Sequence, residues 1–207
     1  MVNLNIICIG KLKEQYLRDA SAEYLKRMQT ICKLTVTELP AEKLSENPSQ
    51  KEIEKALDIE GKKIIEKIPK GSAVFAMCIE GKQRSSEELS TELDGLALSG
   101  VSNAVFIIGG SFGLSDEVKM KSRYKLSMSK MTFPHQLARI MLLEQLYRAA
   151  QISMGTRYHK RQIQKTFKKL LINSVNRAII QLISIGRVGF SERSPLFFIA
   201  EFTIEYL

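Results

Sequence analysis

The chain has 207 residues, of which 44% are hydrophobic, so it can bury a sizeable core as one domain or as one domain with an appendage. Its net charge of +9 favours a polyanionic partner, first of all nucleic acid, although a merely basic protein without such a partner is the plain alternative. The absence of tryptophan and the aromatic content of only 7% argue against a stacking platform for single strands.

The sequence shows no sign of export or of membrane insertion. Its three cysteines lack metal-binding or redox spacing, which is typical of a reducing compartment. The first residues lead directly into an apolar strand, and no apolar run approaches the roughly 20 residues that a membrane span needs. We therefore expect a cytoplasmic protein without disulfides and without a membrane partner.

Short apolar runs alternate with segments of helical periodicity as far as residue 151. Strands are predicted at residues 4–9, 34–39, 73–79, 104–108 and 124–127. Helices are predicted at residues 13–30, 49–67, 85–98 and 135–151, with a short helix after residue 115. Their expected N-caps are Ser49, Ser85 or Ser86, and Ser115. Glu80, Gly81 and Lys82 are expected to turn the chain after the third strand.

This alternation predicts an α/β fold with an open parallel sheet and helices on both faces. Ligands of such sheets bind outside the carboxyl ends of the strands. The loops after the third, fourth and fifth strands therefore form the candidate site.

Residues 161–207 have a different character from the rest of the chain. A basic amphipathic stretch is followed by an apolar and aromatic end, and the segment has too little core to fold alone. We expect residues 1–160 to form the domain and residues 161–207 to be an appendage of unknown role. The sequence does not distinguish three origins for this appendage: a native extension, a read-through or an artefact.

Two glycines and two histidines lie in or near the candidate site. Gly109 and Gly110 follow an apolar strand, where they would allow positive φ and close approach to a ligand, although a plain tight turn explains them equally well. Their spacing does not match the dinucleotide pattern, and neither a phosphate-binding P-loop nor a GxSxG elbow is present. His135 and His159 are the only histidines, and either a role in the site or a structural role fits them. No cluster of metal ligands is visible, so no metal is expected.

Six motifs occur together in one order. They are GKLK at residues 10–13, EY at 23–24, IEGK at 79–82, FIIGGSFGL at 106–114, SKMTFPHQLARIMLLEQLYRA at 129–149 and YHK at 158–160. On these motifs, residues 1–160 resemble the ribosomal large-subunit pseudouridine methyltransferases of the RlmH type, in the SPOUT superfamily. The resemblance implies a C-terminal trefoil knot, an exception to the rule against knots, and a homodimer. It also implies S-adenosylmethionine as cofactor and methylation at N3 of a pseudouridine in large-subunit (23S) rRNA.

The resemblance also implies which residues bind the cofactor. The matching positions are Met77, Gly109, Met128, Ser129, Lys130, Met131, Thr132 and Phe133. Met77 stands where leucine is common, which is a conservative exchange in a pocket wall. Without the resemblance, Met128, Met131 and Phe133 would be taken for plain core residues.

The implied catalytic residues are His135, Arg139, Tyr158, His159 and Lys160. His159 would accept the N3 proton or orient the base, and Lys160 and Arg139 would neutralise the developing uracil anion or hold phosphate. A helix-surface charge or an interface salt bridge is the open alternative for Arg139. The chain departs from the family pattern at two places near residues 158–160. Arg157 stands where the family has a small residue or proline, and 47 residues follow Lys160.

Three functions remain at this point. The first is methyl transfer to a large-subunit pseudouridine, and the basic, aromatic-poor composition favours assembled ribosomes over naked rRNA fragments as the substrate. The second is a non-catalytic RNA- or ribosome-binding protein that keeps the fold. The third, a nucleotide-dependent oxidoreductase, is disfavoured by the spacing of the glycines.

Overall fold

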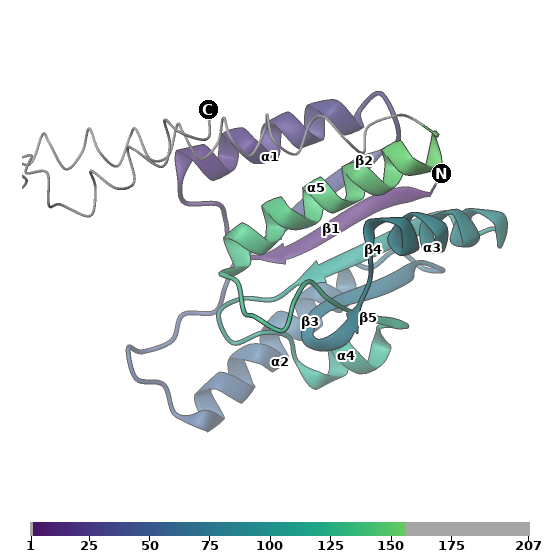
Figure 1. Cartoon of the computed structure of the whole chain (residues 1–207). Coiled ribbons are helices and arrows are strands. Elements are labelled where there is room, and N and C mark those ends of the chain that lie inside the picture. Colours follow the sequence, from purple (N-terminus) through teal and green to yellow (C-terminus); the bar gives the residue numbers. More distant parts are fainter. Residues whose placement is uncertain (1, 156–207) are drawn as a thin grey trace, which may run out of the picture. The chain divides into compact units, whose positions relative to one another are not determined.

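A computed structural model describes residues 2–155 of the chain (Figure 1). The chain divides into two units, Met1–His159 and Lys160–Leu207. Tyr158, His159, Lys160 and the predicted appendage lie outside the described residues, so their predictions stay untested. Within residues 2–155, no helix is long and apolar enough to cross a bilayer.

One five-stranded parallel sheet forms the centre of the fold. Its strands are β1 (Asn3–Ile9), β2 (Leu34–Leu39), β3 (Ala73–Gln83), β4 (Asn103–Ile108) and β5 (Tyr124–Ser127). They lie in the order β2-β1-β4-β3-β5, and every neighbouring pair is parallel. The predicted parallel α/β sheet is therefore confirmed. The trefoil knot stays a prediction.

Helices cover both faces of the sheet, as predicted. They are α1 (Gln15–Met28), α2 (Gln50–Glu66), α3 (Ser86–Leu98), α4 (Asp116–Lys121) and α5 (His135–Ser153). Helix α5 packs against α1 and α3, whereas α2 and α4 pack together on the opposite face (Figure 1). This arrangement places the start of α5 at the edge of the sheet where the strands end.

The predicted N-caps begin three of these helices. Ser49 and Ser85 each accept a hydrogen bond from the backbone of the third helical residue, and the glutamate at that position bonds back to the cap. Ser115 accepts from the N–H of Val118 at the start of α4. Local side-chain chemistry thus sets these three boundaries.

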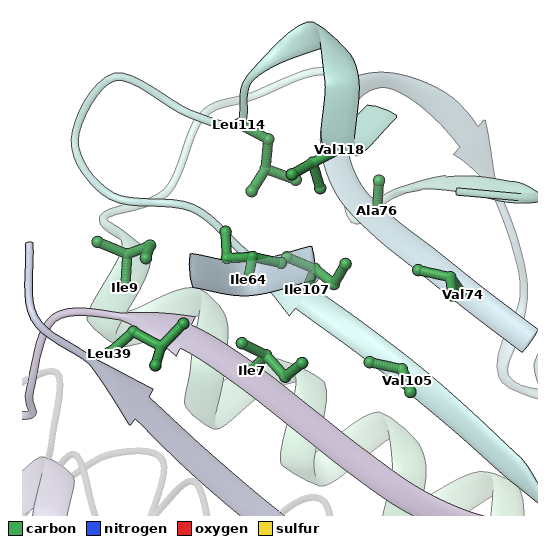
Figure 2. Packing of buried hydrophobic residues seen from close by; sticks show 10 residues of the cluster. All are labelled: Ile7, Ile9, Leu39, Ile64, Val74, Ala76, Val105, Ile107, Leu114 and Val118. Carbon is green, nitrogen blue, oxygen red and sulfur yellow. The ribbon is translucent and has the colours of Figure 1, made fainter. Parts of the chain in front are cut away.

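Alternation along the central strands divides the core into two layers. The layer beneath α2 and α4 is built from aliphatic side chains of β1, β3 and β4 that meet Ile64, Leu114 and Val118 (Figure 2). The residues at the alternate positions, among them Leu4, Ile6 and Phe106, are fully buried toward the other face. Both faces of the inner strands are therefore apolar, as the continuous hydrophobic runs predicted.

Aromatic rings join the three strands that lead to the candidate site. Phe75 of β3 stacks on Phe106 of β4 at a centroid distance of 4.6 Å and on Tyr124 of β5 at 4.4 Å. The three residues are also direct neighbours in the ladder. Offset aromatic pairs contribute about 0.5–1.5 kcal/mol beyond the area that they bury. The stack therefore fixes β4, β3 and β5 side by side below their carboxyl ends.

The predicted turn at Glu80, Gly81 and Lys82 is wrong, because β3 continues to Gln83. The ladder with β5 shifts register between Met77 and Lys82, both of which pair with Leu126. A Cβ atom on Gly81 would lie 2.6 Å from the backbone of Leu126, so only glycine permits this return to the ladder. The residues between the two pairs bulge out of the strand at its carboxyl end.

Candidate functional site

A cavity of about 420 Å³ lies at the carboxyl ends of β3, β4 and β5. This volume is within the range of about 300–1,000 Å³ that is usual for small-molecule sites. Three segments and the start of α5 line the cavity: the β3 bulge from Met77 to Glu80, the turn from Ile108 to Leu114, and the loop after Leu126. The site thus lies where an open parallel sheet is expected to bind its ligand.

Most of the residues predicted to bind a cofactor surround this cavity. The lining includes Met77, Gly109, Met128, Ser129, Met131, Thr132 and Phe133. Lys130 is exposed and is not among the lining residues. Met128 and Phe133 are only half-buried and Met131 is 72% exposed, so the alternative of plain core residues does not hold. Their role as cofactor ligands stays a prediction.

The turn after β4 depends on a close contact between two backbone segments. Gly110 and Gly113 form an isolated bridge, and the N–H of Gly113 donates to the carbonyl oxygen of Gly110 at 3.2 Å. A Cβ atom on Gly109 would lie 2.0 Å from the carbonyl oxygen of Gly113. Positive φ was expected at Gly109 or Gly110, but only Gly113 in this turn adopts it, at 87°. The requirement at Gly109 is therefore space for the neighbouring backbone rather than an unusual φ.

Helix α2 supports the same turn from the outside. Gly61 approaches Ser115 so closely that a Cβ atom there would lie 2.3 Å from the serine Oγ. The preceding Glu60 is buried, and its carboxylate accepts a hydrogen bond of 2.8 Å from the N–H of Glu42. Burial raises the pKa of Glu60. The turn that lines the cavity is thus fixed against a helix that does not itself reach the cavity.

The loop after β5 is closed by two serines. Ser127 donates to the carbonyl oxygen of Ser129 at 2.9 Å, and Ser129 accepts from the N–H of Met131 at 3.0 Å. These short-range bonds are typical of serine turns. They hold the loop in a compact form and leave the apolar side chains of Met128 and Met131 available to a ligand.

His135 begins α5 and lines the cavity. The ring is half-buried, and its Nε2 lies 3.5 Å from the position that a Cβ atom on Gly10 would take. Burial, and then the charges of Arg139 and Lys13, lower the pKa of His135 below its usual 6.5. The imidazole is therefore neutral at pH 7, with one nitrogen able to accept a hydrogen bond.

Arg139, one helical turn after His135, is 1% exposed. Its guanidinium donates to a carboxylate oxygen of Glu38 at 2.5 Å and to the carbonyl oxygen of Gly10 at 2.8 Å. The alternative of a helix-surface charge is therefore wrong, since the charge is internal and paired. Arg139 does not line the cavity, and its predicted catalytic role stays untested.

Two charged residues of the cavity were not predicted from the sequence. Glu80 in the β3 bulge and Lys119 of α4 form an ion pair of 2.7 Å, and both line the cavity. The hydrogen bond from Lys119 lowers the pKa of Glu80, which is therefore ionised at pH 7. The position of Glu80 just after the apolar part of a strand was the available signal. Residues 2–155 contain no group of three or more candidate metal ligands.

The comparisons with known proteins agree with this architecture. The family model described as "Predicted SPOUT methyltransferase" matches residues 2–159. Proteins named "Ribosomal RNA large subunit methyltransferase H" from Bacillus thuringiensis (strain Al Hakam), Bacillus cereus (strain B4264) and Bacillus anthracis are each 53% identical over 159 residues. These alignments cover 77% of this chain and 100% of each relative. The chain belongs to the SPOUT methyltransferase family.

Replacement of Gly109 by alanine tests the backbone contact in the turn after β4. We expect Gly109→Ala to displace residues 109–113 and to abolish binding of S-adenosylmethionine, the cofactor that the resemblance implies, because the new methyl group collides with Gly113. Gly95→Ala in α3 is the matched control, since nothing lies within 4 Å of its Cβ position. The control should bind the cofactor normally. Its free energy of unfolding should rise by roughly 0.5–1 kcal/mol, which slightly raises its unfolding temperature. Normal calorimetric binding by a folded Gly109→Ala variant would contradict the assignment.

Proposed function

We propose that the chain transfers a methyl group from S-adenosylmethionine to N3 of a pseudouridine in the rRNA of the large ribosomal subunit. The observation that carries this proposal is the 53% identity to the rRNA methyltransferases over their entire length. The proposal is also supported by the cavity, because seven of the eight residues predicted to bind the cofactor line it. We further propose that the enzyme acts in the cytoplasm as a knotted homodimer.

The residues of the cavity fit such a cofactor. Met77, Leu126 and Phe133 provide apolar walls for an adenine ring, and the strand ends supply backbone N–H and C=O groups to read its edge. The ion pair of Glu80 and Lys119 offers charges of both signs, which complement a zwitterionic amino-acid group. When bound, the cofactor supplies an electrophilic methyl group. Gly109 and residues 128–133 would hold it.

The chain's own groups then have to position the uracil ring and remove its N3 proton. We assign to His159 the role of general base that accepts the N3 proton. Tyr158 and Lys160 would orient the uracil ring and neutralise its developing negative charge. His135, neutral and at the cavity wall, can accept a hydrogen bond from the substrate. Arg139 acts through its bonds to Glu38 and Gly10 by fixing the first turn of α5.

Methylation of ribosomes by the purified full-length protein tests the function. We expect transfer of a labelled methyl group to large subunits or ribosomes that lack the modification, and much slower transfer to naked rRNA fragments. The charge of +9 favours a large folded RNA surface as the substrate. Calorimetry with S-adenosylmethionine separates the alternative, because a non-catalytic ribosome-binding protein would bind ribosomes without binding the cofactor. Equal rates on ribosomes and fragments would contradict the proposed substrate form.

The assignment of His159 leads to a separate prediction. We expect His159→Ala to bind S-adenosylmethionine with unchanged affinity and to lower kcat by about 10²–10⁴-fold, which is the usual contribution of a general base. His159→Gln is a useful companion, since it keeps a hydrogen-bonding side chain but cannot carry the proton away at pH 7. Single-turnover methyl transfer measures both variants. A wild-type rate in His159→Ala would remove this residue from the mechanism.

The proposed division of the chain at Lys160 can be tested by shortening it. The family model matches residues 2–159, and the relatives align with this chain over 159 residues, which is their full length. We expect a protein of residues 1–160 to fold, dimerise and bind the cofactor at least as well as the full chain. Thermal unfolding, sedimentation and calorimetry are the measurements. Loss of dimerisation or of cofactor binding would make residues 161–207 an integral part of the enzyme.

A further inference from the structure

The loop between β1 and α1 presents two lysines to solvent. Lys11 and Lys13 are both exposed, whereas Leu12 between them is only 8% exposed. Within residues 2–155, neither lysine has an acidic partner in an ion pair. The loop thus offers two uncompensated positive charges on either side of a buried anchor.

The first end of this loop is tied to the sheet and to α5. The N–H of Gly10 donates to the carbonyl oxygen of Leu39 at 2.8 Å, and Arg139 donates to the carbonyl oxygen of Gly10 at 2.8 Å. Gly10 has a φ of 85°, which only glycine adopts readily. The chain therefore leaves β1 in one defined direction.

The second end is fixed as firmly. Arg18 of α1 donates to the carbonyl oxygen of Leu12 at 3.0 Å and also to that of Lys13. The N–H of Lys13 donates to the side chain of Gln136 in the first turn of α5 at 2.7 Å. The backbone of the loop is thus preorganised, while the lysine side chains take no part in these bonds. Preorganised charges lose less entropy when they bind a ligand.

The loop lies beside the proposed reaction site. Strand β1 pairs with β4, and their parallel course brings Gly10 to the same edge of the sheet as Gly109. Lys13 is close enough to His135 for its charge to lower the pKa of that cavity residue. The loop therefore runs next to the cavity, and neither lysine is among the residues that line it.

We propose that Lys11 and Lys13 bind the phosphate backbone of the RNA strand that carries the target nucleotide. The inference rests on the proposed rRNA substrate and assigns one of its contact surfaces. A lysine ammonium is a point charge that binds phosphate without reading sequence, which suits positioning rather than recognition of the base. Two such contacts on a loop whose backbone is tied to α5 would bring the strand to the cavity in a defined register.

The test compares two double variants of the full-length protein. Lys11→Ala with Lys13→Ala removes the proposed contact. Lys67→Ala with Lys70→Ala removes the same charge from exposed positions just before β3, at the opposite edge of the sheet. Binding to unmodified large ribosomal subunits is measured between about 50 and about 200 mM salt at constant Mg²⁺, together with cofactor binding and methyl transfer.

The salt dependence gives the decisive result. We expect the slope of log K against log salt to become less steep by about 1.5–2 in the Lys11/Lys13 variant, with a raised KM for subunits and an unchanged kcat. Cofactor affinity should be that of the wild type, and the Lys67/Lys70 variant should keep the wild-type slope. Lys11→Arg with Lys13→Arg should also keep it, because the charges remain.

Other outcomes overturn the inference. Equal slopes in the two alanine variants would show that the loop does not contact RNA, and loss of cofactor binding in the Lys11/Lys13 variant would assign the lysines to the cavity instead. If the wild type binds subunits but transfers no methyl group, the proposed function fails, and the slopes still decide whether this loop is an RNA contact. Absence of any wild-type binding to subunits would refute both.

Discussion

The buried guanidinium of Arg139 is the interaction on which the geometry of the site depends. It joins three elements at once, because it sits on α5, donates to the carbonyl oxygen at the end of β1 and pairs with Glu38 near the end of β2. A charge with 1% exposure is tolerated only when it is paired and hydrogen-bonded. Removal of Glu38 would leave the guanidinium buried without its counter-charge, whereas Glu38 itself is one-third exposed and would keep contact with solvent if Arg139 were removed. The position of α5, and with it that of His135, is therefore strongly determined.

Close approach of the backbone to its neighbours is the second constraint, and glycines permit it in and around the segments that form the cavity. Gly109 admits the carbonyl of Gly113, Gly81 admits the backbone of Leu126, and Gly61 admits Ser115. None of these three glycines has a positive φ. Their common property is the missing Cβ atom, which lets loops cross one another at distances that no other residue allows. The cavity is thus shaped by backbone, and side chains such as Met128 and Phe133 complete its apolar surface.

Much of this fold could be predicted because its signals are local. Strands β2 and β5 occur at the predicted residues, and the capping serines begin α2, α3 and α4 where they were expected. The errors have a different origin. Glu80, Gly81 and Lys82 have the composition of a turn, but Lys82 pairs with Leu126, far away in the sequence, and the ladder therefore continues. Local composition cannot reveal such a partner.

The same distinction applies to the site. The glycine turn and the loop at residues 128–133 were found because whole motifs mark them, and the structure brings both to one cavity. The burial of Arg139 was not predicted, because its partner Glu38 is 101 positions away and a basic residue on a helix is usually exposed. The pair of Glu80 and Lys119 was missed for the same reason. The sequence did not reveal these charge pairs or the pairing of Lys82 with Leu126, because each joins residues that are far apart in the chain.

The charges of the site are arranged so that one group remains neutral among several cations. Burial, and then the positive charges of Arg139 and Lys13, oppose protonation of the His135 ring and lower its pKa. Arg139 is compensated by Glu38, whereas Lys13 has no acidic partner within residues 2–155. An RNA phosphate bound at Lys13, as proposed, would neutralise the lysine and leave burial and Arg139 to hold the pKa of His135 below its usual value.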